Sequence, residues 1–429
     1  MLQEAEKLLP NNSLEIRSPE PDGFGDFFVT AFKVTVIDSR SFLYNLREVG
    51  ILIYLDNAAT TLIKPQKVYD EVMWCMKSSA NAGRGDYGAS AESSRVIFET
   101  RLSLARLFNI RNPERIVFTC NATHSLNTAI KGFAGFGGHI VISGMEHNSV
   151  LRPVQNLADR GIITYSIAKA DRFGMVYPES IINEIRNNTQ LIVITHVSNV
   201  CGTVNDIYEI RRQTGKIPML IDASQSAGVL DIDMERLENS MLAFPGHKGL
   251  YGPQGTGGLY IPDSFELRTL MEGGTGSESE NSRQPSDLPD KFESGTMNSP
   301  GIAGLDAGTE FVLEKTPAEI LRHELLLAKD IIDHISKLEG VRICGYPDME
   351  NRTGVVAFCV KGRDCVEICT RLSEEFSIAS RGGLHCAPLA HQSLGTFSCG
   401  AIRFSPGAFT TADEVDFAMF ALKKIIRNT

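Results

Sequence analysis

From residue 51 onward the sequence alternates short apolar, β-branched segments with longer amphipathic segments. This alternation restricts the fold more than any other feature, because strands separated by helices indicate βα units around a mostly parallel sheet. A chain of 429 residues exceeds one compact core, so we expect two or more domains. The predicted strands are residues 115–119, 139–143, 191–196 and 218–222, and a helix is predicted over residues 91–108.

The C-terminal part has a different pattern, which predicts a smaller α+β domain. Thr316 begins a helix with a cap, a following proline and an acid at the third position, and Gly340 is suited to end it. Thr411 and Glu414 form a capping box for the last helix. The predicted elements are a helix over residues 316–338, a strand over 355–360, a helix over 364–376 and a final helix from residue 411.

Two segments lack the alternating pattern of strands and helices. Residues 1–50 contain turn-forming proline, asparagine and glycine clusters and one possible strand at 32–37, so we treat them as an N-terminal extension of unknown role. Residues 273–289 are polar and rich in Gly, Ser and Pro, which predicts a loop.

Composition narrows the class of protein. The formal net charge of −10 and the absence of a long Lys/Arg run argue against a nucleic-acid-binding surface. No apolar stretch is long enough to span a bilayer, and the first ten residues do not have the pattern of a secretory signal. Nine cysteines without such a signal suggest free thiols in a reducing cytoplasm, and the lack of a Cys-x-x-Cys pair makes a structural zinc site unexpected.

One lysine lies where chemistry is feasible. Lys248 is on a tight turn between an apolar run at 241–244 and a glycine-rich stretch at 252–258. A lysine held there can form an imine if burial or nearby cations lower its pKa, although a solvated loop lysine is the alternative. Asp222 ends a predicted strand, where ligands bind in open α/β sheets, but the cap of a helix is an equal reading of that residue.

Three further residues are candidates for a functional site, but none of them indicates a function by itself. Thr123 precedes a predicted helix whose N-terminus could bind phosphate. His147 follows a strand and could stack on a ring or move protons, or be a structural histidine. Cys386 lies near Arg381 and His385, which could lower its pKa, or it is one inert thiol among nine.

Taken in order, these segments resemble the class V aminotransferase family of pyridoxal-phosphate (PLP) enzymes, and specifically its cysteine desulfurase branch. The resemblance runs from Tyr54 to the C-terminus, and six motifs in register make it specific. The motifs are Tyr54-Leu55-Asp56-Asn57-Ala58-Ala59-Thr60-Thr61, Glu146-His147-Asn148, His196-Val197-Ser198-Asn199-Val200, Asp222-Ala223-Ser224-Gln225, Gly246-His247-Lys248 and Phe292-Glu293-Ser294-Gly295-Thr296.

The resemblance implies an α/β fold of PLP-transferase fold type I, with a mostly parallel seven-stranded sheet in the large domain, a small α+β C-terminal domain and a homodimer. We therefore place a large PLP-binding domain at residues 51–305, with its first residues joining the small domain, and a small domain at 306–429 that carries the cysteine loop.

The resemblance also implies a role for each site residue. Lys248 would carry PLP as a Schiff base and Asp222 would pair with its pyridine nitrogen, while His147 stacks on the ring. Cys386 would form the persulfide. The remaining positions are Asn199 and Gln225 near the phenolic oxygen, Ala122, Thr123, His247 and the other subunit's Thr296 near the phosphate, and Asn57, Arg381 and Arg403 at the substrate.

The implied reaction converts L-cysteine to L-alanine and leaves a persulfide for an acceptor protein. The pattern of residues 381–387 matches the short-loop group, which includes selenocysteine lyases, so L-selenocysteine is an alternative substrate. Transamination, epimerisation or β-elimination without a persulfide is a further alternative, as is a non-catalytic protein that kept the fold. Three departures from relatives concern the phosphate and cysteine loops: Pro245 replaces a serine, Asn121-Ala122-Thr123-His124 replaces Gly-Thr-Thr-Glu, and Leu384 replaces a histidine.

Overall fold

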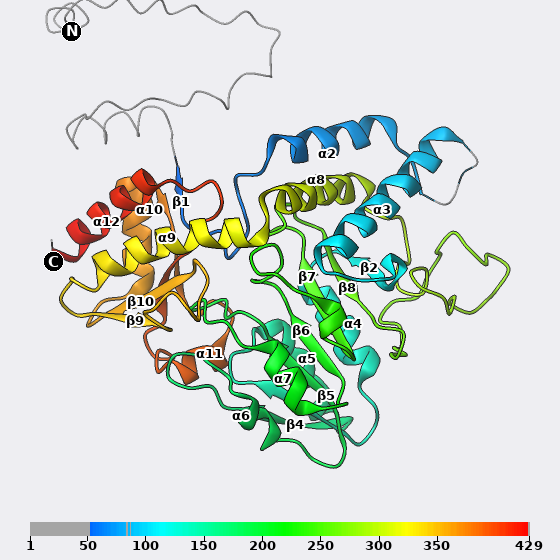
Figure 1. Cartoon of the computed structure of the whole chain (residues 1–429), viewed down its shortest axis with the longest axis horizontal. Coiled ribbons are helices and arrows are strands. Elements are labelled where there is room, and N and C mark those ends of the chain that lie inside the picture. The colour runs from blue at the N-terminus through cyan, green and yellow to red at the C-terminus, as the bar shows by residue number, and fades with distance from the viewer. Residues whose placement is uncertain (1–51, 83–84, 86, 428–429) are drawn as a thin grey trace, which may run out of the picture. The chain divides into compact units, whose positions relative to one another are not determined.

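The computed structural model describes residues 52–82, 85 and 87–427 (Figure 1). The N-terminal extension inferred for residues 1–50, with its possible strand at 32–37, lies outside the described residues. Among the described helices, none is long and apolar enough to cross a membrane.

A seven-stranded sheet, with strand order β2-β8-β7-β6-β5-β3-β4, forms the centre of the larger part of the chain. The neighbours from β7 to β4 are parallel, whereas β8 runs antiparallel to β7 and β2. The mostly parallel sheet predicted from the alternating pattern is thereby confirmed. Its strands are β2 (Ile116–Thr119), β3 (Gly138–Ser143), β4 (Ile163–Ala168), β5 (Thr189–Thr195), β6 (Met219–Asp222), β7 (Ser240–Pro245) and β8 (Gly257–Tyr260).

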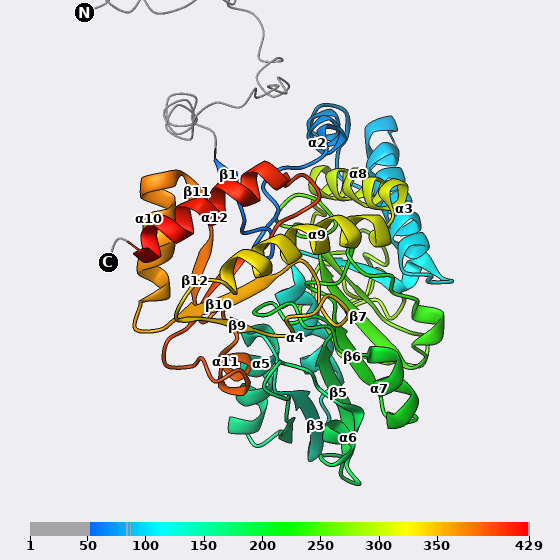
Figure 2. The same ribbon diagram turned by 60° about the vertical axis from the view of Figure 1, so that its left-hand side comes forward.

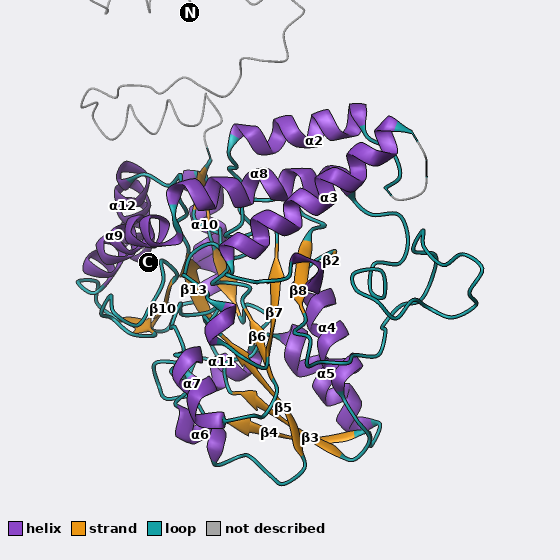
Figure 3. Ribbon diagram, turned by 45° about the vertical axis from the view of Figure 1, so that its right-hand side comes forward, coloured by secondary structure: helices purple, strands orange, loops and turns teal. Residues whose placement is uncertain are grey.

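Helices cover both faces of this sheet (Figures 1 and 3). Successive strand residues point to opposite faces, so Ile140 packs with the apolar residues of α4 and α5, whereas Val141 packs with those of α3, α7 and α8. Burial on both faces explains the continuous apolar runs in the sequence. The helices are α2 (Gln66–Ser78), α3 (Gly88–Leu107), α4 (Ala122–Phe133), α5 (Asn148–Asp159), α6 (Pro178–Ile182), α7 (Ile207–Thr214) and α8 (Ser299–Lys315), with short 3-10 turns at Pro113–Arg115 and Met234–Arg236.

The C-terminal part has an antiparallel four-stranded sheet of order β12-β13-β10-β9, with helices packed around it (Figure 2). A two-stranded parallel pair, β1 (Ile53–Tyr54) with β11 (Ile378–Ala379), connects the start of the described chain to this part. The other elements are α9 (Pro317–Ile335), β9 (Val341–Cys344), β10 (Val356–Val360), α10 (Cys365–Phe376), β12 (Arg381–Gly383), α11 (Pro388–Ser393), β13 (Ala401–Phe404) and α12 (Ala412–Arg427).

The helix signals read from the sequence are confirmed at their starts. The Thr316 side chain accepts a hydrogen bond from the Glu319 N–H, and Thr411 and Glu414 bond to each other's backbone N–H groups. The predicted end of the first of these helices was wrong. Helix α9 ends at Ile335, and Gly340 lies at φ +76° in the turn before β9, because the chain reverses direction over several residues there.

Helix α8 was not predicted, because it lacks an amphipathic pattern. It packs beside α2 and α3, and Ala303, Gly304 and Gly308 are buried together with its larger residues (Figure 3). A helix surrounded by protein has no polar stripe for sequence periodicity to detect. The polar stretch at 273–289, by contrast, is the loop that the sequence predicts, since residues 261–298, all of which are described, contain no helix or strand.

Glu324 of α9 makes the free energy of unfolding depend on pH. Burial raises the pKa of Glu324 from its ordinary value of 4.5 to about 8. The contribution of Glu324 to the free energy of unfolding is therefore fully present below about pH 4.5 and is lost as the pH rises through about 8. We expect Glu324→Gln, which stays uncharged, to gain stability relative to wild type between about pH 5 and about pH 8.5.

Urea unfolding of both proteins at the two pH values measures this difference. Glu319→Gln, an exposed position on the same helix, is the matched control and should leave the pH dependence unchanged. If wild type and Glu324→Gln differ in stability by the same amount at both pH values, the prediction is contradicted.

Candidate active site

A cavity of about 180 Å³ lies where β5, β6 and β7 end, which is the edge of a parallel sheet at which ligands bind. It brings together residues from ten positions that the sequence singled out. These are Ala122, Thr123, His147, Asn199, Asp222, Gln225, His247, Lys248, Arg381 and Arg403. The rest of the wall is Ala58, Ala59, Asn121, Ser149, Thr195, Val197, Ser224, Pro245 and His385.

Lys248 projects from the turn between β7 and β8. The turn is closed by hydrogen bonds from the Gly246 N–H to the Thr256 carbonyl and from the Tyr251 N–H to the Lys248 carbonyl. Burial lowers the pKa of Lys248 from 10.5 to about 8, although the Asp222 carboxylate opposes that shift. The uncharged amine, which is the nucleophilic and basic form, is therefore a far larger fraction of this lysine at neutral pH than of an ordinary lysine.

Asp222 is the last residue of β6 and is 2% exposed. Its Oδ1 accepts a hydrogen bond from the Ser224 N–H at 2.9 Å, but residues 224–229 form turns, so Asp222 does not cap a helix. Burial raises the pKa of the nearby Glu146 to about 8, and the charge of Asp222 adds to that shift. Glu146 is therefore mostly uncharged near neutral pH, and Asp222 is the carboxyl group that lines the cavity.

His147 is a neutral ring at the start of α5. Its Nδ1 accepts from the Ser149 N–H at 3.0 Å, which leaves the ring proton on Nε2. Burial lowers the pKa of His147 to about 4, and the nearby Lys248 and Arg381 add to the shift, against the opposing Asp222 carboxylate. A neutral imidazole in the wall is suited to stacking on a flat ligand rather than to binding an anion.

The N-terminus of α4 offers backbone donors to the cavity. Ala122 and Thr123 are its first residues, and Asn121 caps the helix by accepting from the His124 N–H. The opening N–H groups of a helix have no intrahelical partner and favour an anion. His247 lies in the same wall, with its Nδ1 3.0 Å from the Thr60 hydroxyl, and burial lowers the pKa of His247 to about 4.

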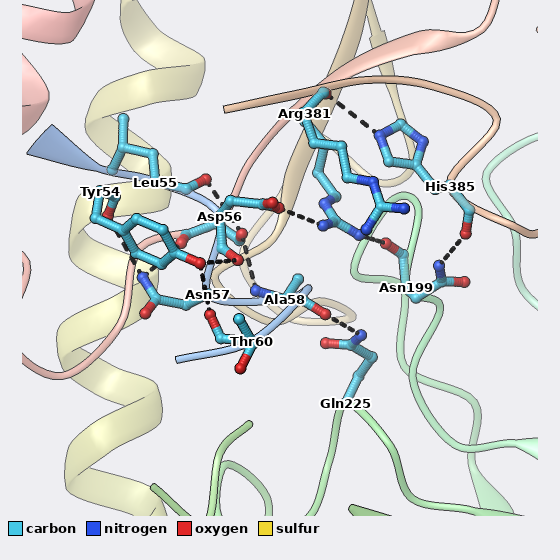
Figure 4. Close-up of polar contacts among 12 residues, drawn as sticks. Tyr54, Leu55, Asp56, Asn57, Ala58, Thr60, Asn199, Gln225, Arg381 and His385 are labelled. Atoms are coloured by element: carbon cyan, nitrogen blue, oxygen red, sulfur yellow. Dashed lines mark hydrogen bonds and ion pairs between the residues drawn. The ribbon is translucent and has the colours of Figure 1, made fainter. Parts of the chain in front are cut away.

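Two arginines face the cavity from the C-terminal part. Arg403 is 1% exposed, and it donates to Asp56 Oδ1 at 2.5 Å and to the Asn199 carbonyl at 2.8 Å. Its Nε has no hydrogen-bond partner among the described residues. Asp56 lies in the segment from Tyr54 to Thr60 (Figure 4). The sequence analysis quoted the motif that contains Asp56 but gave this residue no role.

The side-chain amides of Asn199 and Gln225 both donate hydrogen bonds to backbone carbonyls (Figure 4). Asn199 Nδ2 donates to the His385 carbonyl at 2.8 Å, and Gln225 Nε2 donates to the Ala58 carbonyl at 2.9 Å. These bonds connect the cavity wall to the cysteine loop and to the first described segment, so the two amides are held in fixed orientations.

Cys386 is exposed and lies next to the cavity-lining His385 rather than in the wall itself. Both residues have positive φ angles, +50° for His385 and +55° for Cys386, and the Asn148 N–H donates to the Cys386 carbonyl at 2.8 Å. His385, one of the two neighbours that the sequence places beside this thiol, is a neutral ring in the structure. Burial lowers the pKa of His385 to about 2, and its Nδ1 lies 3.3 Å from His391 Nε2.

Two other predicted site residues lie outside the cavity wall. Asn57 is in the neighbouring wall formed with Ser405 and Gly407, and its Nδ2 donates to the Ser405 carbonyl at 3.0 Å. Thr296 is exposed and does not reach the cavity of its own chain. Its motif is anchored by Glu293, which accepts from the Phe118 N–H at 2.7 Å and pairs with Arg101.

Comparison with known proteins gives consistent matches over nearly all of the described chain. A model of the family described as aminotransferase class-V matches residues 53–417. A probable cysteine desulfurase of Methanothermobacter thermautotrophicus is 32% identical over 381 residues, which cover 87% of this chain and 94% of that protein. The cysteine desulfurase IscS of Pseudoalteromonas translucida is 32% identical over 404 residues, covering 87% and 92%.

Solved structures give the same result for the fold. The apo structure of the cysteine desulfurase from Thermococcus onnurineus NA1 matches with a TM-score of 0.82 and 28% identity, covering 92% of this chain and all of that one. The cysteine desulfurase CsdA of Escherichia coli, at 24% identity and a TM-score of 0.78, shows the same fold.

Proposed function

This chain belongs to the aminotransferase class-V family, and from that premise we propose that it is a PLP-dependent cysteine desulfurase that converts L-cysteine to L-alanine and passes the sulfur to Cys386. The family resemblance drawn from the six motifs is confirmed by these matches. One observation carries the proposal for the reaction: a low-pKa lysine, a buried carboxylate and a neutral histidine line one cavity, and an exposed cysteine lies directly beside it.

The residues present fit pyridoxal phosphate. Asp222 would pair with the ring nitrogen, His147 would lie on the ring face, and Lys248 would bind the aldehyde carbon. The backbone donors of Ala122 and Thr123 and the imidazole of His247 would hold the phosphate, because they line the same cavity and the first N–H groups of a helix favour an anion. Pro245 stands where relatives have a serine and supplies no hydroxyl. Backbone donors would therefore be more important for phosphate binding here than in those relatives.

When bound, the cofactor supplies an electron sink for the substrate's α-carbon. The Lys248 amine would remove the α-proton of the substrate and return a proton later in the cycle. A pKa of about 8 suits both tasks, because a group that titrates near the working pH gives and takes protons with little driving force lost. Asp222, from its buried position, would favour a protonated ring nitrogen.

Arg381 and Arg403 would bind the substrate. The substrate carboxylate would approach Arg403 through its unpartnered Nε and the cavity-facing Arg381, since guanidinium groups bind carboxylates in a planar fork. Asp56 already holds one Nη of Arg403 and fixes the plane of that guanidinium.

The sulfur step would belong to Cys386. Its thiolate would attack the substrate sulfur, so that a sulfur–sulfur bond forms as the carbon–sulfur bond breaks. The electron pair of the broken bond stays with the carbon, which takes up a proton, and the fragment leaves as alanine. The left-handed backbone at His385 and Cys386 is fixed by hydrogen bonds to their carbonyls from Asn199 and Asn148. Backbone strain that the surroundings enforce is common where a reactive group must be presented in one orientation.

The test of the function is direct. Purified protein is given L-cysteine with a reductant, and alanine and sulfide are measured, with mass spectrometry of the Cys386 peptide for an added sulfur atom. L-selenocysteine is assayed in parallel, because the short cysteine loop resembles that of selenocysteine lyases as well. Pyruvate or a keto acid in place of alanine would reject the desulfurase proposal.

Asp222→Asn tests the proposed ring partner. We expect the variant to bind the cofactor and to lose about 10²-fold in the rate of alanine release, because an amide cannot keep the ring nitrogen protonated. Asp231→Asn, at an exposed position, is the control. Normal turnover by Asp222→Asn would show that this carboxylate serves the turn at Ser224 alone.

Several finer features are proposed with the activity. Residues 51–305 would bind the cofactor, and residues 306–429 would bring the cysteine loop to it. A homodimer would let the exposed Thr296 of one subunit reach the phosphate of the other. A separate acceptor protein would take the sulfur, and the composition favours a cytoplasmic location.

A further inference from the structure

Four cysteines lie in and beside the four-stranded sheet of the C-terminal part, outside the cavity wall. Cys344 is in β9, Cys359 in β10, Cys365 begins α10, and Cys399 is on the loop before β13. All four are free thiols, and none of them lines the cavity that contains Lys248. Within the described ranges, no three His, Cys, Asp or Glu side chains are grouped so that they could hold a metal ion, so metal binding does not explain the group.

Hydrogen-bond donors converge on the sulfur of Cys359. The Cys344 sulfur lies 3.7 Å from it, and Arg342 Nη2, on the cross-strand partner residue, lies 3.8 Å from it. The Cys399 thiol is also within hydrogen-bonding reach of Cys359. The protonated Cys359 thiol donates to the Gly400 carbonyl at 3.4 Å, and the Cys344–Cys359 bond can run in either direction. Arg342 is a donor in every case, so its cation, with the two thiols able to donate, favours a thiolate at Cys359.

The electrostatics agree with this geometry. Donation from Cys344, together with the charge of Arg342 and donation from Cys399, lowers the pKa of Cys359. The pKa of Cys344 is raised in return, chiefly because it gives its proton to that hydrogen bond, and burial raises the pKa of Cys399. Arg342 contacts the sulfur of Cys359 and not that of Cys344, so we assign the nucleophile of the group to Cys359.

Cys399 is positioned to react with an oxidised Cys359. Both thiols donate to the same oxygen, the Gly400 carbonyl, at 3.4 Å, and Cys399 is exposed. Cys344 is less suitable, because it occupies a diagonal cross-strand position, where Cα separations of about 7–8 Å exceed the span of a disulfide.

We propose that Cys359 is a peroxide-reactive thiol that is converted to a disulfide with Cys399. In the first step the Cys359 thiolate attacks one oxygen of hydrogen peroxide, the O–O bond breaks, and the departing hydroxide takes a proton to become water. In the second step the Cys399 sulfur attacks the resulting sulfenic acid, an S–S bond replaces the S–O bond, and a second water leaves with the thiol proton. Two thiols are oxidised by two electrons, and one peroxide is reduced.

The test uses the full-length protein without substrate, so its outcome is independent of the proposed desulfurase activity. Reduced protein is treated with hydrogen peroxide, quenched with iodoacetamide at intervals and mapped by mass spectrometry. We expect Cys359 to lose its reactivity with iodoacetamide at least about fivefold faster than the exposed Cys120, and a peptide pair linked through Cys359 and Cys399 to appear.

Variants separate the roles. Cys399→Ser should stop the reaction at a sulfenic acid on Cys359 that dimedone captures, and Arg342→Gln should slow the loss of free Cys359 by about threefold or more. Cys369→Ser, a buried cysteine of α10 outside the group, is the matched control and should leave the linked peptide unchanged. Oxidation of Cys359 no faster than Cys120, or a link from Cys359 to Cys344 or Cys365 instead, overturns the proposal.

Discussion

Lys248→Ala is expected to lower the rate of alanine release from L-cysteine by about 10³-fold or more, because the change removes both the covalent attachment of the cofactor and the base for the α-proton. The purified variant should also lose the lysine–cofactor adduct that borohydride reduction traps in wild type. Peptide mapping after reduction measures this directly, since the cofactor mass should be on the Lys248 peptide in wild type only.

Lys64→Ala is a demanding control for this experiment. Burial lowers the pKa of Lys64 to about 8 as well, but its amine donates to the Thr61 carbonyl at 2.9 Å and does not line the cavity. A low pKa alone would make both lysines candidates, whereas position in the cavity selects Lys248. Cofactor found on any lysine other than Lys248 would remove the assignment.

Cys386→Ala is expected to abolish desulfuration of L-cysteine, by about two orders of magnitude or more, while the lysine–cofactor adduct persists. The reason is that the substrate sulfur loses the thiolate that would accept it. Alanine release and the cofactor absorbance of the same preparation are the two measurements. Cys120→Ala, which removes the exposed thiol next to the cavity-lining Asn121, is the matched control and should retain activity.

The same variant distinguishes the two substrates. A selenol is largely ionised at neutral pH and leaves carbon more readily than a thiol does, so selenocysteine can react without a protein nucleophile. Activity of Cys386→Ala on selenocysteine alone would favour a selenocysteine lyase, and loss on both substrates would favour an obligatory persulfide-type step. Undiminished alanine release from cysteine would exclude the proposed role of Cys386.

The local features of this protein could be read from its sequence. The strand at 218–222, the turn that carries Lys248 and the caps at Thr316 and Thr411 depend on residues a few positions apart, and each was predicted where the structure has it. Motif order then indicated the family, because six short segments in register are specific even though each alone is weak.

Contacts between distant segments were decided by the tertiary structure. Asp56 and Arg403 are 347 positions apart, and they meet only because the segment after β1 and the strand β13 lie side by side. The stacking of His385 on His391 and the convergence of donors on Cys359 likewise depend on strand register and loop closure. Periodicity reports which face of an element is buried, but it carries no information about which other element covers that face. For this reason the sequence alone determined most of the elements and most of the candidate residues, while the tertiary structure revealed helix α8 and the role of Asp56 and decided which residues share a cavity.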